Sequence, residues 1–100
     1  MYTTVRKYEG VSDPQAAAKK VQENFVPLIS AMPGFVEYLW IDLGQGAMLS
    51  VSVFDSLGHA IDSNQTAAGW VGKNLTILPP ATRIENGKVV ARKGIGKATS

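Results

Sequence analysis

The sequence has no cysteine and only one histidine, His59. The lack of cysteine excludes disulfides and thiolate metal sites, and a lone histidine provides no cluster of metal ligands. No apolar run approaches the ~18 residues that a membrane-spanning helix needs, and residues 1–7 lack the apolar core of a signal peptide. We therefore expect a cytoplasmic protein that holds no metal and does not act at a membrane.

Charged residues are also few, and they are unevenly placed. The chain is 18% charged and 45% hydrophobic over 100 residues, which is the composition of a small globular domain. Residues 83–100 hold five basic residues and one acidic residue, whereas residues 1–82 hold five basic and seven acidic residues. No aromatic residue lies among the C-terminal charges, so a platform for stacking nucleic-acid bases is not indicated. We expect one domain over residues 1–92, a flexible basic tail over residues 93–100, and no nucleic-acid partner.

The order of secondary structure can be followed along the chain. A strand is predicted over residues 2–8, and the pattern Ser12-Asp13-Pro14-Gln15 predicts the start of a helix. That helix should be disturbed at Pro27 and end at Pro33-Gly34. The later segments are two strands over residues 35–43 and 47–54, a helix from about 55 to 74, and a strand or hairpin over residues 81–92 that turns at Asn86-Gly87.

The two central strands are apolar on both faces. With Gln45 at the centre of the turn, Leu43 pairs with Ala47, Ile41 with Leu49, Leu39 with Val51 and Glu37 with Val53. We expect this aliphatic face to pack under the helices. The opposite face is larger and amphipathic, and we expect a second copy of the chain to cover it, giving a homodimer; it holds Val36, Tyr38, Trp40, Met48, Ser50, Ser52 and Phe54.

The order strand–helix–strand–strand–helix–strand predicts an α+β, ferredoxin-like βαββαβ fold with an antiparallel sheet. Within it, Met32-Pro33-Gly34-Phe35, the segment Ser50 to Asp55, Asn64 and the segment Ala67 to Val71 resemble the antibiotic biosynthesis monooxygenase-like family of the dimeric α+β barrel superfamily. The resemblance spans roughly residues 2–92. It implies a cofactor-free monooxygenase that acts on a small aromatic or polyketide-like metabolite in an apolar pocket.

The resemblance also suggests ligand-binding residues, because the family's pockets commonly use Asn, Trp and Tyr side chains. Asn64, Tyr38, Trp40 and Trp70 supply these types here, and Asn64 is predicted to be the polar anchor of a pocket between the sheet and the second helix. Each has a structural alternative. Asn64 can bond to backbone, Tyr38 and Trp40 can pack at the dimer interface, and Trp70 lies off the predicted inward stripe, under the C-terminal segment or a partner chain.

No catalytic residue can be named from the sequence, because no clear base for a phenol is evident. Haem-degrading relatives in the same superfamily need an axial histidine that faces the cavity, and His59 is predicted to point away from the sheet. Haem degradation is therefore disfavoured. The alternative to an oxygenase is a non-catalytic dimeric barrel that binds a small apolar ligand or has a regulatory or stress role.

The inward stripe of the second helix is predicted from helical spacing. It comprises Leu57, Ala60, Ile61, Asn64, Ala68, Val71 and Leu75.

Overall fold

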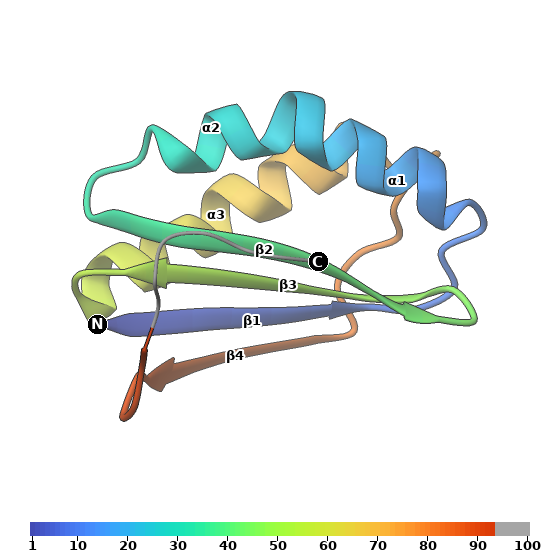
Figure 1. Ribbon diagram of the computed structural model, residues 1–100. Coiled ribbons are helices and arrows are strands. Elements are labelled where there is room, and N and C mark those ends of the chain that lie inside the picture. Colours follow the sequence, from blue (N-terminus) through green and yellow to red (C-terminus); the bar gives the residue numbers. More distant parts are fainter. Residues whose placement is uncertain (94–100) are drawn as a thin grey trace.

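A computed structural model describes residues 1–93 as an antiparallel four-stranded sheet with helices on one face (Figure 1). The strand order is β2-β3-β1-β4, in which the first strand lies between the third and the fourth. This is the α+β ferredoxin-like arrangement that the sequence predicts. The elements are β1 (Tyr2–Tyr8), α1 (Pro14–Lys20), η1 (Val21–Phe25), α2 (Val26–Ser30), β2 (Phe35–Gly44), β3 (Ala47–Phe54), α3 (Leu57–Gly72) and β4 (Arg83–Lys88).

The predicted first helix is divided into α1, the π-helical turn η1 and α2. Asp13 caps its start, since its side chain accepts a hydrogen bond from the Ala16 amide at 3.1 Å. Pro27 lies in the first turn of α2 and has no N–H to donate to the carbonyl four residues earlier. The π-helical turn η1 precedes it, and proline and single π turns are both known causes of a bend in a helix.

The pairing of β2 with β3 follows the predicted register over most of its length. Leu39 pairs with Val51, Ile41 with Leu49 and Glu37 with Val53. The predicted pair of Leu43 with Ala47 is wrong, because an irregularity after Asp42 places Gly44 opposite Ala47 instead. The Asp42 side chain accepts a hydrogen bond from the Gly44 amide at 2.9 Å, which tightens the chain ahead of the turn.

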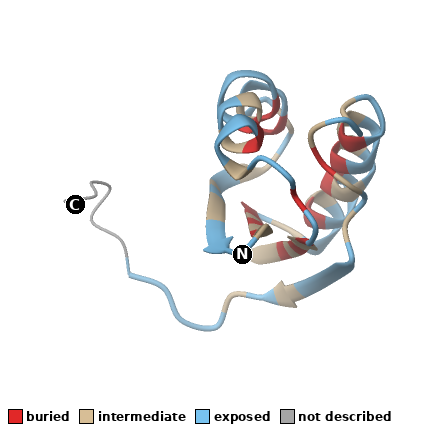
Figure 2. Cartoon of the chain, turned by 90° about the vertical axis from the view of Figure 1, so that its right-hand side faces the viewer, coloured by how far each residue is buried: buried red, intermediate tan, exposed pale blue. Residues whose placement is uncertain are grey.

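The assignment of the two sheet faces from the sequence is also wrong. The amphipathic face packs under the helices, where Phe54 is 0% exposed and Tyr38 and Trp40 are largely covered. The aliphatic face is bare, and Leu39 on it is 49% exposed; Val53 is its one buried member. The view in Figure 2 shows the helices packed over one side of the sheet, with buried residues on the surfaces that meet. The physical reason is that Tyr38, Ser50 and Ser52 on the covered face have hydrogen-bond partners, so burying their hydroxyl groups is tolerated.

The inward stripe of α3 is rotated from the predicted one. The buried residues are Ala60, Ser63, Ala67 and Val71, and Trp70 is partly buried beside them. Leu57, Ile61 and Leu75, which were predicted to face the core, are exposed. Trp70 therefore faces the core rather than a partner chain, and small Ala and Ser side chains let the helix lie close to the large aromatic residues of the sheet.

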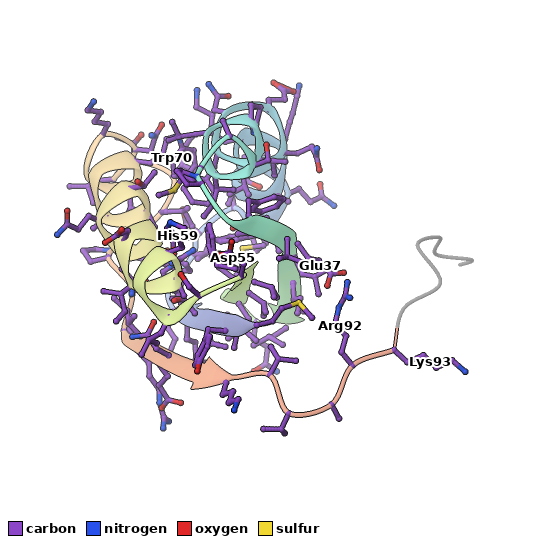
Figure 3. The ribbon with its side chains drawn as sticks, turned by 90° about the vertical axis from the view of Figure 1, so that its left-hand side faces the viewer. Glu37, Asp55, His59, Trp70, Arg92 and Lys93 are labelled. Carbon is purple, nitrogen blue, oxygen red and sulfur yellow. The ribbon has the colours of Figure 1, made fainter. Side chains whose placement is uncertain are left out.

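Residues 81–92 contain one strand, β4, and do not form the hairpin that was the alternative prediction. β4 pairs with β1, and Asn86 and Gly87 lie within the ladder opposite Thr4 and Thr3. After the strand, the Val89 amide donates to the Met1 carbonyl, and Arg92 reaches the Glu37 carboxylate at 3.9 Å (Figure 3). The tail predicted over residues 93–100 lies almost wholly outside the described residues.

Candidate functional site

The centre of the candidate site is Arg6, a buried arginine in β1. Alternation along the strand points Thr4, Arg6 and Tyr8 toward the helices, and Arg6 is only 1% exposed. Its Nη2 donates to Ser52 Oγ at 2.8 Å and to Ser50 Oγ at 3.3 Å, and its Nη1 donates to Asn64 Oδ1 at 2.9 Å. Strands β1 and β3 and helix α3 thus all hold the guanidinium group.

Further polar groups extend this network to both edges of the sheet. On one side, Ser50 Oγ donates to the Tyr38 hydroxyl oxygen at 3.0 Å. On the other side, Asn64 Nδ2 donates to Asn86 Oδ1 at 3.3 Å, and Thr4 Oγ1 donates to the same oxygen at 2.6 Å. Asn64 is the half-exposed member of the network that lies next to Arg6.

The charge of Arg6 has no carboxylate beside it. All eight Asp and Glu residues of the chain lie in the described part and are exposed, and the ion pairs found over residues 1–93 do not include Arg6. Burial lowers the pKa of Arg6, yet a guanidinium does not lose its proton in a protein. A buried cation with only neutral partners is costly, and such costs concentrate at functional sites.

A groove opens above Arg6, between α3 and β4. Its volume is about 330 Å³, within the range of about 300–1,000 Å³ that is usual for small-molecule sites. Arg6, Tyr8 and Asn64 supply its polar groups, and among residues 1–93 Arg6 is the only charged residue in its lining. The remainder is apolar or small: Ala68, Val71, Gly72, Leu75, Pro80, Ala81 and Ile84.

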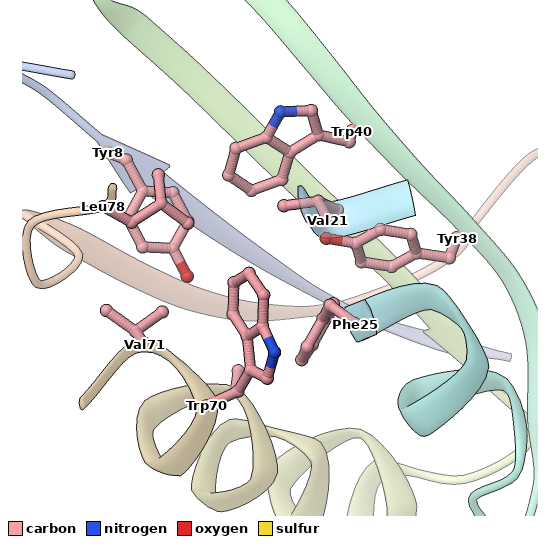
Figure 4. A pocket seen from close by; sticks show the side chains of 9 residues that line it. Tyr8, Val21, Phe25, Tyr38, Trp40, Trp70, Val71 and Leu78 are labelled. Atoms are coloured by element: carbon pink, nitrogen blue, oxygen red, sulfur yellow. The ribbon is translucent and has the colours of Figure 1, made fainter. Parts of the chain in front are cut away.

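A second, nearly filled cavity lies on the other side of Tyr8, between the helices and β2 (Figure 4). Its volume is about 10 Å³, at the lower limit of the space that one water molecule needs. Aromatic rings fill it: the ring centroids of Phe25 and Trp70 are 5.3 Å apart, those of Phe25 and Tyr38 5.5 Å, and those of Tyr8 and Trp40 5.4 Å. Burial raises the pKa of Tyr38 to about 12 and also raises that of Tyr8.

The structure therefore divides the four residues predicted from the sequence. Tyr38, Trp40 and Trp70 meet in the filled aromatic cavity, and Asn64 lies in the open groove. Sequence reasoning missed Arg6. The sequence carried a partial signal, because Arg6 occupies the same face of a period-2 strand as Thr4 and Tyr8; its pairing with Ser50 is seen only in the structure.

His59 lies away from the groove, in the first turn of α3. Its Nδ1 is 2.7 Å from Asp55 Oδ1, and its amide donates to Ser56 Oγ, the cap of the helix. The hydrogen bond with His59 lowers the pKa of Asp55. The described residues contain no group of three or more side chains that could hold a metal ion. Over the same residues, no helix has the length and apolar character to cross a membrane.

Comparison with known proteins finds similarity in structure alone. Neither a family model nor a curated protein matches the sequence. A protein from Chloroflexus aurantiacus J-10-fl, whose name assigns it provisionally to the antibiotic biosynthesis monooxygenases, is 18% identical with a TM-score of 0.66 and covers 95% of this chain and 98% of its own. The monooxygenase from the gene ActVA-Orf6 of Streptomyces coelicolor, solved with nanaomycin D, is 13% identical with a TM-score of 0.62, covering 97% and 92%.

A third structure is that of a MhuD variant with two manganese protoporphyrin IX molecules bound per active site. It is 14% identical with a TM-score of 0.68 and covers 94% of this chain and 99% of its own. At these identities the likeness establishes the fold. The chain has the fold of the antibiotic biosynthesis monooxygenase-like proteins, as the sequence resemblance predicts.

Proposed function

We propose that the protein is a cofactor-independent monooxygenase-like enzyme for a small aromatic or polyketide-like metabolite, and that it works as a homodimer. The observation that carries this proposal is the apolar groove whose single charged group is the buried guanidinium of Arg6. An electron-rich aromatic compound fits the apolar walls. A cation in a poorly solvated site stabilises the negative charge that develops when such a compound loses a proton.

The reaction needs nothing beyond substrate and oxygen. A CH₂ group of the substrate becomes C=O, one atom of O₂ enters the product, and the other atom leaves with the two hydrogens as water. The substrate supplies all the electrons. The protein's contribution would be to hold the ring in the groove, to stabilise its anion through Arg6 and to exclude water from the reacting carbon.

The mechanism requires a base that takes a proton from the substrate, and the described residues that line the groove offer none, which favours a second candidate function. Asn64 and Arg6 are not bases, and the raised pKa of Tyr8 reflects a hydroxyl that keeps its proton. The substrate would therefore have to lose its proton to solvent at the groove mouth. A non-catalytic barrel that binds a small ligand, with a regulatory or stress role, needs no such step.

Haem degradation fits the residues less well. The only histidine of the chain is His59, and it is bonded to Asp55 outside the groove. No histidine is therefore available in the groove lining as an axial ligand.

Two glycines of α3 provide a matched test. A Cβ at Gly72 or at Gly69 would meet nothing within 4 Å, so both positions accept a side chain, yet only Gly72 lines the groove. We expect Gly72→Leu to reduce kcat/KM for oxygen-dependent oxidation of hydroxylated aromatic CH₂ compounds by at least about tenfold, equivalent to about 1.4 kcal/mol. Gly69→Leu should leave it unchanged.

The measurement is oxygen consumption together with product formation, with one O₂ expected per carbonyl formed. If the wild-type protein binds such compounds in a Gly72-dependent way but consumes no oxygen with any of them, the non-catalytic candidate replaces the oxygenase. Loss of activity in both leucine variants would place the site elsewhere.

A further inference from the structure

The charge of Arg6 specifies what the groove accepts. Of its five N–H groups, three make the hydrogen bonds to Ser50, Ser52 and Asn64, and Nε is buried with no partner among the described residues. A structural arginine in a protein interior is normally paired with a carboxylate. Here every acidic side chain is exposed, so the positive charge is left uncompensated.

We propose that the groove selects a ligand with one oxyanion on a flat apolar body, and that Arg6 is the residue that recognises this charge. The inference rests on the proposed function, because it names the substrate class of the same site. A single cation lines the groove, so a monoanion neutralises it and a dianion leaves excess charge in an apolar site.

Asn64 lies where the oxyanion of a ligand would reach Arg6. Its Oδ1 accepts from Arg6 Nη1 at 2.9 Å, both residues line the groove, and its own amide makes only a long bond of 3.3 Å to Asn86. An incoming oxyanion replaces this neutral acceptor, or joins it, with a charge-assisted bond that is roughly twice as strong. The two serines below hold the guanidinium in place meanwhile.

The test compares two ligands of the same shape. Naphthalene carboxylate and the neutral naphthalene carboxamide differ by one charge, and their binding is measured by calorimetry without oxygen. We expect the wild-type protein to bind the carboxylate at least about tenfold more tightly than the carboxamide. Equal affinity, or no binding of either compound, overturns the proposal.

Variants locate the preference. Arg6→Met should abolish it, and Arg6→Lys should keep most of it because the charge stays. Arg83→Met removes a cation that lies outside the groove lining, so it should have no effect. A preference that survives Arg6→Met, or that Arg83→Met also abolishes, would reflect the general surface charge and would overturn the proposal.

A spectroscopic measurement tests ligands that carry a hydroxyl group. It uses the wild-type protein, so it does not depend on the folding of Arg6→Met. Bound naphthol should show phenolate absorption at a pH where free naphthol is neutral, because the cation stabilises the ionised form. Absorption of the neutral phenol in the bound state contradicts the proposal. The two proposals can fail separately. If the protein prefers the carboxylate but consumes no oxygen, only the oxygenase proposal is wrong. If it oxidises compounds that bind as neutral molecules, only the proposed selectivity for anions is wrong.

Discussion

The two faces of the sheet differ in chemistry and in what covers them. The face under the helices carries a buried arginine, two buried serines and a tyrosine, together with Met48 and Phe54. The bare face carries aliphatic side chains such as Leu39 and Val51. The comparison teaches that polarity does not decide which face is buried when the polar groups bond to one another. The covered face holds the candidate site, and the bare face is the one that the proposed homodimer would bury.

The largest expected effect tests which face belongs to the core. Phe54→Ala removes a fully buried ring that stacks edge-on against Phe35 at 5.9 Å, so it should lower the free energy of unfolding by about 3–5 kcal/mol. Leu39→Ala, on the bare face, should cost the monomer less than about 1 kcal/mol. Urea denaturation at several protein concentrations measures both. Equal losses that do not depend on concentration would contradict the assignment of the faces.

The next effect tests the burial of Tyr38. The pKa of Tyr38 is raised from 10.0 to about 12 in the folded protein, so the unfolded chain loses this proton at a lower pH than the folded protein does. Its contribution to stability is complete below pH 10 and is lost as the pH rises toward 12. The loss should amount to about 2–3 kcal/mol.

Chemical denaturation from pH 9 to pH 12 measures this decline. The range begins about one unit below the ordinary pKa of tyrosine. Tyr38→Phe has no hydroxyl to ionise, so its curve should be flatter than that of the wild-type protein over the same range. Parallel curves would show that the Tyr38 hydroxyl is accessible to solvent in the folded state.

Much of the fold could be predicted from local patterns. The element order and three of the four predicted residue pairs between β2 and β3 follow from period-2 alternation and from the glycines around Gln45, which itself has a φ of 56°. The faces could not be predicted in this way, because strand periodicity shows which residues share a face and not which face the helices cover. The uniform aliphatic character of one face predicts, wrongly, that this face belongs to the core. Ser50 and Ser52 can be buried because they accept hydrogen bonds from Arg6 in β1, which is about 45 residues away in the sequence.

The candidate site was predictable only in part for the same reason. Asn64 could be singled out because it is a polar residue on a helical stripe, and it does lie in the groove lining. Helical spacing misplaces Trp70, because the largest aliphatic residues of α3 predict one stripe, whereas the buried stripe consists mostly of small residues. Arg6 joins groups from β3 and α3, and no local pattern reports a contact of that kind.

The smallest expected effect concerns the bare face and the proposed homodimer. Leu39 and Val51 pair across β2 and β3 and would otherwise leave an apolar surface in contact with water. Val51→Lys places a charge at the centre of this face, so we expect the dimer dissociation constant to rise at least about tenfold, or about 1.4 kcal/mol, while the monomer stays folded. Leu28→Lys is the control, since Leu28 on α2 is 45% exposed, close to the 49% of Leu39, and the helices pack on the other face of the sheet. Sedimentation equilibrium measures the association. A wild-type protein that remains monomeric at low micromolar concentration, or one whose association Leu28→Lys weakens as much as Val51→Lys does, would show that the bare face is not the dimer interface.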